Sequence, residues 1–193
     1  MKIYQLLSNA AACAAICTIC ASSAIAGTDA SSFDVAGIKL GMTPAEVQTK
    51  IAQHFGISKN KVHTYSQPQL LLGGKPAITA INYEANGESL QVLFETVSIN
   101  PADPVPAYQI NYKLPFSREN AEQLKAAAIQ KYGTPTVNSY PLQWCANATN
   151  PALCDSGQAT LKVGNTDLSL EDDRYVQRYL QLLDDQRSRK PRL

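Results

Sequence analysis

The sequence predicts an α+β fold, an antiparallel sheet with helices packed on one face. Three local patterns indicate this class. Two segments combine helical spacing of apolar residues with start and stop signals, two asparagine–glycine turns separate runs of alternating apolar and polar residues, and the charged segment near the C-terminus again has helical spacing. Such an order of hairpins and helices is typical of sheets that are covered on one side.

The first helix is the clearest single element. Thr43 is a good N-cap, Pro44 fits the first helical position, and Glu46 is placed to bond back to the cap, which makes a capping box. Gly56 supplies the left-handed residue that ends a helix. We therefore expect a helix over 44–55, whose buried side carries the apolar residues at a spacing of four, Val47, Ile51 and Phe55.

The other elements follow from alternation and turn residues. Tight hairpins are expected around residues 86–87 and 164–165, where asparagine and glycine are adjacent. Further helices should run from Ser117 to Tyr132 and over 172–187. Strands are expected at 61–65, 78–84, 88–97, 108–114, 158–163 and 166–171, and residues 33–40 should form a short strand or an extended arm. The residues with helical spacing in the last helix are Val176, Tyr179, Leu180 and Leu183.

Two parts of the chain repeat the same order of signals. Residues 33–97 and 108–171 each contain a strand, a capped helix, a glycine stop and a hairpin. In both, 31 residues separate the helix-ending glycine from the hairpin glycine, Gly56 from Gly87 and Gly133 from Gly164. The pattern is consistent with a tandem helix-plus-hairpin duplication.

Residues 1–26 have the features of a secretory signal peptide. Lys2 precedes an apolar run that is short for a membrane span, and an Ala-x-Ala pattern precedes Gly27. We therefore expect a periplasmic or secreted protein whose mature part, residues 27–193, forms one domain with no membrane span.

Two cysteines, Cys145 and Cys154, follow the leader. In an exported protein this pair predicts one disulfide across a polar loop. A catalytic thiol or a metal-binding pair is the alternative, and the thiol would need one of two histidines that are distant in sequence, His54 or His63. Within the leader, Cys20 follows isoleucine and not a small residue, so we expect no lipid anchor.

Charge and motifs exclude several classes. The chain has 17 basic and 16 acidic residues, and without Lys2 the two numbers are equal, which does not suit electrostatic binding of nucleic acid or of a membrane surface. There is no Gly-x-Ser-x-Gly nucleophile motif, and two isolated histidines do not make a zinc site. We therefore assign no catalytic or metal-binding residue and expect no cofactor.

The segment at 41–47, Gly-Met-Thr-Pro-Ala-Glu-Val, resembles the helix opening of the BamE (SmpA/OmlA) family of outer-membrane assembly lipoproteins. The segment at 131–135, Lys-Tyr-Gly-Thr-Pro, resembles the glycine-x-proline helix ending of such domains, and the β-lactamase-inhibitor-protein type of fold is similar in layout. The resemblance covers residues 37–56 and 131–135. It implies an envelope or secreted protein that binds other proteins, and it transfers no catalytic residue. This chain departs from the family because it has no lipid-acceptor cysteine and a longer mature part.

Aromatic side chains are the candidate binding residues. Tyr140 and Trp144 border the disulfide loop, and Tyr108 and Tyr112 alternate along one predicted strand. Aromatic residues are enriched where proteins meet, and a stapled loop beside them would form a pre-ordered contact site. The alternative is that Trp144 and the strand tyrosines pack in the core.

The resulting hypothesis is an exported protein that acts by binding a protein partner of the cell envelope or secreted milieu, as an inhibitor or an envelope-assembly accessory. A small secreted hydrolase and a carrier of a small apolar ligand are the alternatives. A cleft with converging histidine and acidic groups would favour the hydrolase, a closed apolar cavity the carrier, and a shallow concave sheet the protein binder.

Overall fold

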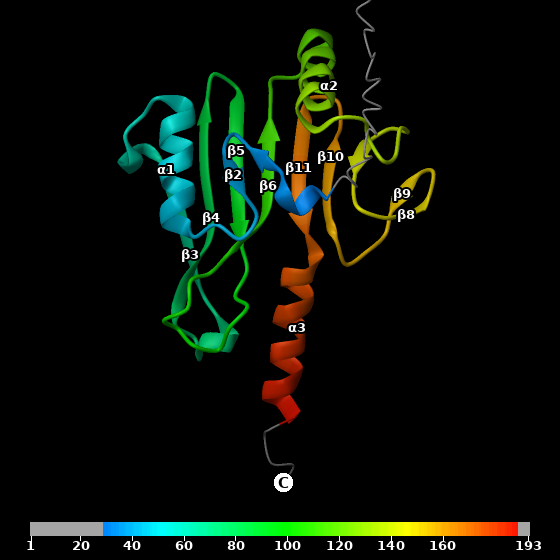
Figure 1. The fold of residues 1–193 in the computed structure, drawn as a ribbon. Helices are drawn as coiled ribbons and strands as arrows, with labels where there is room; N and C mark the ends of the chain where they lie inside the picture. The colour runs from blue at the N-terminus through cyan, green and yellow to red at the C-terminus, as the bar shows by residue number, and fades with distance from the viewer. Residues whose placement is uncertain (1–28, 189–193) are drawn as a thin grey trace, which may run out of the picture.

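A seven-stranded antiparallel sheet forms the centre of the structure, a computed structural model that describes residues 29–188 (Figure 1). Its strands lie in the order β3-β4-β5-β6-β11-β10-β7. They are β3 (His63–Pro68), β4 (Pro76–Ala85), β5 (Glu88–Phe94), β6 (Ala107–Lys113), β7 (Leu142–Trp144), β10 (Ala159–Val163) and β11 (Asp167–Asp172). The α+β prediction is confirmed, whereas the predicted signal peptide, residues 1–26, lies outside the described residues.

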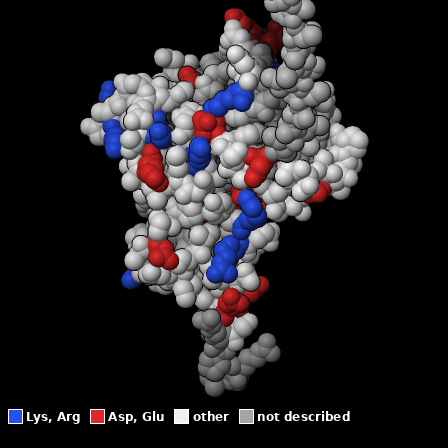
Figure 2. Space-filling view, viewed as in Figure 1, with Lys and Arg blue, Asp and Glu red and all other residues white. Residues whose placement is uncertain are grey.

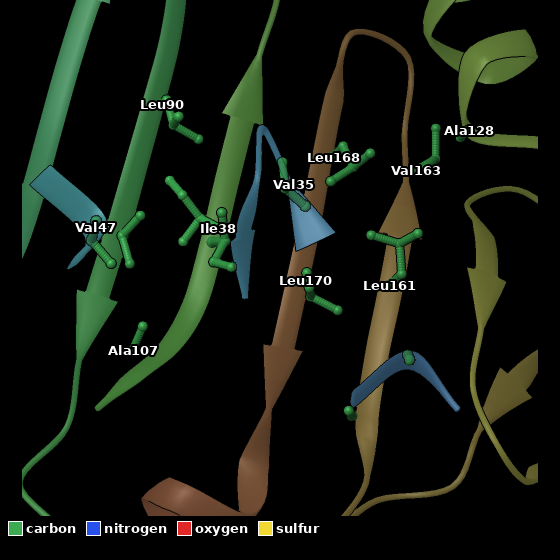
Figure 3. Close-up of a cluster of buried hydrophobic side chains, with 14 of the residues drawn as sticks. Val35, Ile38, Val47, Leu90, Ala107, Ala128, Leu161, Val163, Leu168 and Leu170 are labelled. Carbon is green, nitrogen blue, oxygen red and sulfur yellow. The ribbon is translucent and has the colours of Figure 1, made fainter. Parts of the chain in front are cut away.

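Helices and a small hairpin cover one face of this sheet. They are α1 (Pro44–Phe55), α2 (Arg118–Tyr132) and the pair β1 (Asp34–Val35) and β2 (Ile38–Lys39), which lies between the two helices (Figure 1). Figure 3 shows Val35 and Ile38 beside side chains of the strands below them, and all belong to one buried cluster. The third helix, α3 (Asp173–Ser188), continues from β11 beyond the end of the sheet.

The sequence predicted the first helix at its observed bounds because its end signals are complete. Thr43 Oγ1 accepts a hydrogen bond from the Glu46 N–H at 3.4 Å, and the Thr43 N–H donates to Glu46 Oε2 at 2.8 Å. Gly56 has φ +62°, the left-handed conformation expected of a helix stop. The residues Val47 and Ile51 are fully buried against the sheet.

Removing this cap should destabilise the protein measurably. We expect Thr43→Ala to lower the free energy of unfolding by about 1 kcal/mol, because the Glu46 N–H loses its partner and the Glu46 carboxylate loses the Thr43 hydroxyl. Urea denaturation measures the change. Thr43→Ser is the matched control, since it keeps the oxygen, and an equal loss in both variants would show that the methyl group and not the cap matters.

The β1–β2 hairpin is fastened to α2 by polar contacts. Lys131 Nζ lies 2.7 Å from Asp34 Oδ2, and the Tyr132 hydroxyl donates to the Asp34 carbonyl at 2.7 Å. Burial raises the pKa of the Asp34 carboxyl, but the Lys131 ammonium and the Gly37 N–H together hold this pKa below its ordinary value. The ionised form is therefore favoured in the folded state.

The Asp34–Lys131 pair should contribute a pH-dependent part of the stability. A lowered folded-state pKa means that this contribution is present above the ordinary carboxyl pKa of about 4 and is lost as pH falls through the lowered value. Both side chains are partly exposed, 31% for Asp34 and 46% for Lys131, so we expect only about 0.5–1 kcal/mol. Urea unfolding at several pH values should show a smaller acid loss in Asp34→Asn than in the wild type. Asp185→Asn, at an exposed position on α3, should leave the acid loss unchanged.

Some local predictions were wrong or incomplete. Residues 33–40, expected as one short strand or an extended arm, form the off-sheet hairpin β1–β2, and β7 was not predicted. A second small hairpin, β8 (Ala148–Asn150) with β9 (Leu153–Cys154), was also not predicted. In α3, Leu182 is buried and Leu180 is 47% exposed, so the buried side is rotated from the one expected.

Each of the two predicted half-repeats contains a helix followed by three strands of the seven-stranded sheet. After α1 the strands run β3, β4, β5 from one edge inward, and after α2 they run β7, β10, β11 from the other edge inward. Strand β6 separates the two sets. The first elements differ, because residues 33–40 leave the sheet whereas β6 is its central strand. Common ancestry of the halves stays a prediction.

Candidate functional site

The face of the sheet opposite α1 and α2 carries mostly polar side chains. Strand register places Gln91 opposite Asn111, and Asn111 opposite Ser169, on this face, while their neighbours Val92, Ile110 and Leu170 point into the core. We call it the polar face, and its central residues are Asn82, Ser89, Gln91, Gln109, Asn111, Lys162, Ser169 and Glu171. A hollow of about 460 Å³ lies over β4, β5, β6 and β11.

Hydrogen bonds between neutral side chains organise the middle of the polar face. The Ser169 hydroxyl donates to Asn111 Oδ1 at 2.9 Å, and Gln109 Nε2 donates to the same oxygen at 3.2 Å. Asn111 Nδ2 in turn donates to Gln91 Oε1 at 3.4 Å. Within residues 29–188, Asn82 Oδ1 is buried and has no hydrogen-bond partner. An acceptor in this position is costly to leave unpaired.

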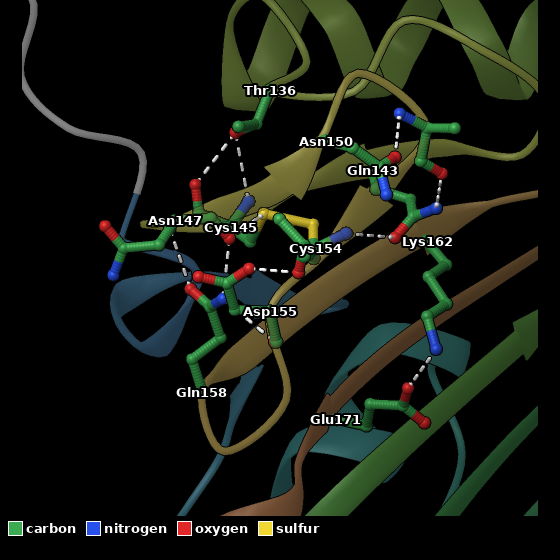
Figure 4. Close-up of a disulfide and its surroundings, with 12 residues drawn as sticks. Thr136, Gln143, Cys145, Asn147, Asn150, Cys154, Asp155, Gln158, Lys162 and Glu171 are labelled. Carbon is green, nitrogen blue, oxygen red and sulfur yellow. Dashed lines mark hydrogen bonds and ion pairs between the residues drawn. A yellow bond between two sulfur atoms is a disulfide. The ribbon is translucent and has the colours of Figure 1, made fainter.

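The predicted disulfide builds a wall at one end of the polar face. Cys145 and Cys154 are bonded, with their Cα atoms 6.0 Å apart, and the bond closes the segment that contains β8 and β9 (Figure 4). Gln143 of β7 ties this segment to the sheet, because its Nε2 donates to the Ala152 carbonyl at 3.4 Å. A second hollow of about 320 Å³ lies between the hairpin and the Lys162–Glu171 ion pair.

Tyr108 lies at an irregularity in the sheet. The β5–β6 register shifts between Leu93 and Phe94, so Tyr108 has no residue directly opposite it. Burial and the nearby carboxylates of Glu95 and Glu171 raise the pKa of its phenol. The irregularity interrupts the alternation that would place Tyr108 on the same strand face as Tyr112, so that expectation stays a prediction.

Tyr112 lies under α1 on the covered face. Its hydroxyl donates to Glu88 Oε1 at 2.6 Å, and His54 Nε2 lies 3.3 Å from the same oxygen. Burial and the Glu88 carboxylate raise the pKa of Tyr112. The adjoining apolar hollow, about 200 Å³, is smaller than the range of roughly 300–1,000 Å³ that is usual for ligand pockets, so it does not favour a carrier.

The two aromatic residues beside the disulfide loop have opposite environments. Trp144 is fully buried and its indole N–H donates to the Gly133 carbonyl at 3.0 Å, so its ring offers no surface to a partner. Tyr140 is 70% exposed. The four candidate residues therefore do not form one site. The polar face instead contains the amides of Gln91 and Asn111, and strand alternation in the sequence could have indicated these two residues.

The helix-covered face carries charges of both signs. Figure 2 shows acidic and basic side chains interspersed over the helix-covered face. Among residues 29–188 no three histidine, cysteine or acidic side chains gather as a metal site would need, and no helix there has the length and apolar character to cross a bilayer.

Comparison with family models, with curated proteins and with solved structures gave no match to this chain.

Proposed function

We propose that this protein is exported and acts by binding another protein through the polar face. The observation that carries the proposal is a sheet covered on one side only, whose open side is hollowed and ends at a disulfide-closed hairpin. A rigid sheet and a stapled wall lose little conformational freedom on binding, which favours affinity. The leader-like residues 1–26 and the oxidised cysteines support export together.

The chemistry of the face defines the kind of partner surface. Gln91 is exposed and its amide nitrogen forms no side-chain hydrogen bond within residues 29–188, while the charges of Lys162 and Glu171 are paired with each other. Such a surface suits the uncharged polar side chains and free backbone groups of a folded protein. It gives selectivity through hydrogen bonds that a mismatched partner leaves unmade.

Position-specific crosslinking tests this proposal. A photoreactive residue at position 91, on the polar face, should form a protein adduct in an envelope extract, whereas one at position 130, exposed on α2, should not. Excess unlabelled wild-type protein should abolish the adduct. Gln91→Arg should compete at least about tenfold less well, and Gln130→Arg, the matched control, should compete normally.

Two outcomes would contradict the proposal. Equal adducts at positions 91 and 130 would mean that contact is unspecific. An adduct that resists protease and yields to glycosidase would replace the protein partner by a polysaccharide.

A further inference from the structure

The two edges of the sheet are protected to different degrees. At the β7 edge, Val137 exchanges two backbone hydrogen bonds with Gln143, at 3.0 and 3.1 Å, so a further segment already lies beside the strand. At the other edge, β3 pairs only with β4 among the described strands, and all six of its residues are exposed. An edge strand with free backbone groups is a template for another extended chain.

A groove opens beside this edge on the helix-covered side. It has a volume of about 650 Å³ and lies between the start of α1, the β3–β4 hairpin and the segment 101–105. Ser66 of β3 lines it, and Ser66 is opposite Ile78, which packs against the core. Most of the other lining residues are apolar, among them Pro44, Leu72, Pro104 and Val105.

The outer wall of the groove is held in shape by local contacts. Asn100 Nδ2 donates to Asp103 Oδ1 at 3.0 Å, and the Asp103 N–H donates to the Asn100 carbonyl at 3.1 Å. The prolines at 101, 104 and 106 restrict the same segment. The groove is therefore preformed, and binding there needs little reordering.

The charge around β3 is mainly positive, and the carboxylate of Asp103, which also lines the groove, is hydrogen-bonded within its own segment. Lys59 and Lys61 precede the strand, Lys75 lines the groove at the far end of the hairpin, and none of the three forms an ion pair within residues 29–188. The strand itself contains no acidic residue. A second copy of this edge would bring like charges together, whereas a segment with carboxylates would complement them.

We propose that β3 and this groove bind an extended acidic–apolar segment of a partner protein, which pairs with β3 as an eighth strand. Backbone hydrogen bonds to β3 hold the segment, and every second side chain points toward the groove because side chains alternate along a strand. Apolar side chains fill the groove, and flanking carboxylates approach Lys61 and Lys75. The groove opens on the face opposite the polar face, so this site does not depend on the function proposed above.

Selection from a displayed library of random peptides about ten residues long tests the proposal. The probe protein is the chain without its leader, and Ser66→Trp, which fills the groove from an exposed position, is the counter-selection variant. Gln67→Trp is the matched control, because Gln67 is the next exposed residue of β3 and is not among the residues that line the groove.

We expect enriched peptides to alternate apolar residues and to carry acidic flanks. Their affinity should fall at least about tenfold in Ser66→Trp, fall less in Lys75→Glu, and stay within about twofold in Gln67→Trp. Hydrogen exchange should show new protection of β3 amides on binding. The proposal is overturned if no peptide binds the wild-type protein better than it binds Ser66→Trp. Enrichment of basic or helical peptides also overturns it, and so does self-association of the protein through β3.

Discussion

Trp144→Ala is expected to cost about 3–5 kcal/mol of unfolding free energy, because it truncates the largest fully buried side chain among residues 29–188. Trp144 packs against Tyr132, with their ring centroids 6.1 Å apart. Its indole N–H also satisfies the Gly133 carbonyl just after α2. Truncation therefore leaves a cavity between the sheet and α2 and an unpaired carbonyl at the helix end. Urea denaturation followed by circular dichroism measures the loss.

Two control variants test whether burial of the Trp144 ring causes this loss. Trp144→Phe keeps an aromatic ring, so its cost should be clearly smaller than that of alanine. Tyr140→Ala, at a residue that is 70% exposed, should change stability by less than about 0.5 kcal/mol. A similar loss for Tyr140→Ala and Trp144→Ala would contradict the different environments assigned to these two residues.

Local signals predicted those elements whose causes are themselves local. The capping box of Thr43 and Glu46 fixes the start of α1, and Gly56 fixes its end. Asn86 and Gly87 both have positive φ at the β4–β5 turn, as a tight hairpin requires. Alternation in β5 likewise separated the buried Leu90 and Val92 from the exposed Gln91, because the period of a strand does not depend on which strand lies beside it.

Features that depend on distant residues were not predictable in this way. Strand β7 has three residues, all buried, so it shows no alternation, and it is defined by pairing with Val163 and Leu161 far along the chain. The register shift at Tyr108 is a property of the β5–β6 pairing and has no signal in the sequence of β6 alone. The candidate site could be predicted only in part. The disulfide was predicted correctly, but the polar face requires β11 to lie beside β6, and no local pattern in the sequence indicates this pairing.

Hydrogen bonds between sequence-distant residues show why the site needs the whole sheet. Asn111 belongs to the first strand of the second half-repeat and Ser169 to its last, and their side chains are 2.9 Å apart. Gln91, which completes the row, comes from the first half-repeat. Neither half contains this arrangement alone, so the polar face is a product of the joined sheet.

Removing the disulfide by Cys145→Ala and Cys154→Ala together is expected to lower stability by roughly 2.5–3 kcal/mol. The bond joins residues nine apart, and the magnitude follows from the loop-closure entropy that it removes from the unfolded chain. Wild-type protein unfolded in a reductant should show a loss close to that of the double variant. A loss below about 1 kcal/mol would mean that the β8–β9 segment keeps its shape without the bond.

The same variant links the disulfide to the polar face. Apart from the bond, mainly the side chains of Gln143 and Gln158 hold the β8–β9 hairpin, so its amides should exchange faster while those of β5 and β6 keep their protection. The measurement is made at a temperature where the sheet is still folded. If the hairpin is a wall of the binding site, crosslinking from position 91 should fall as the hairpin amides lose protection from exchange. Crosslinking at the wild-type level, although the hairpin amides are no longer protected from exchange, would contradict this. It would show that the partner contacts the sheet alone and that the disulfide-closed hairpin contributes to stability and not to recognition.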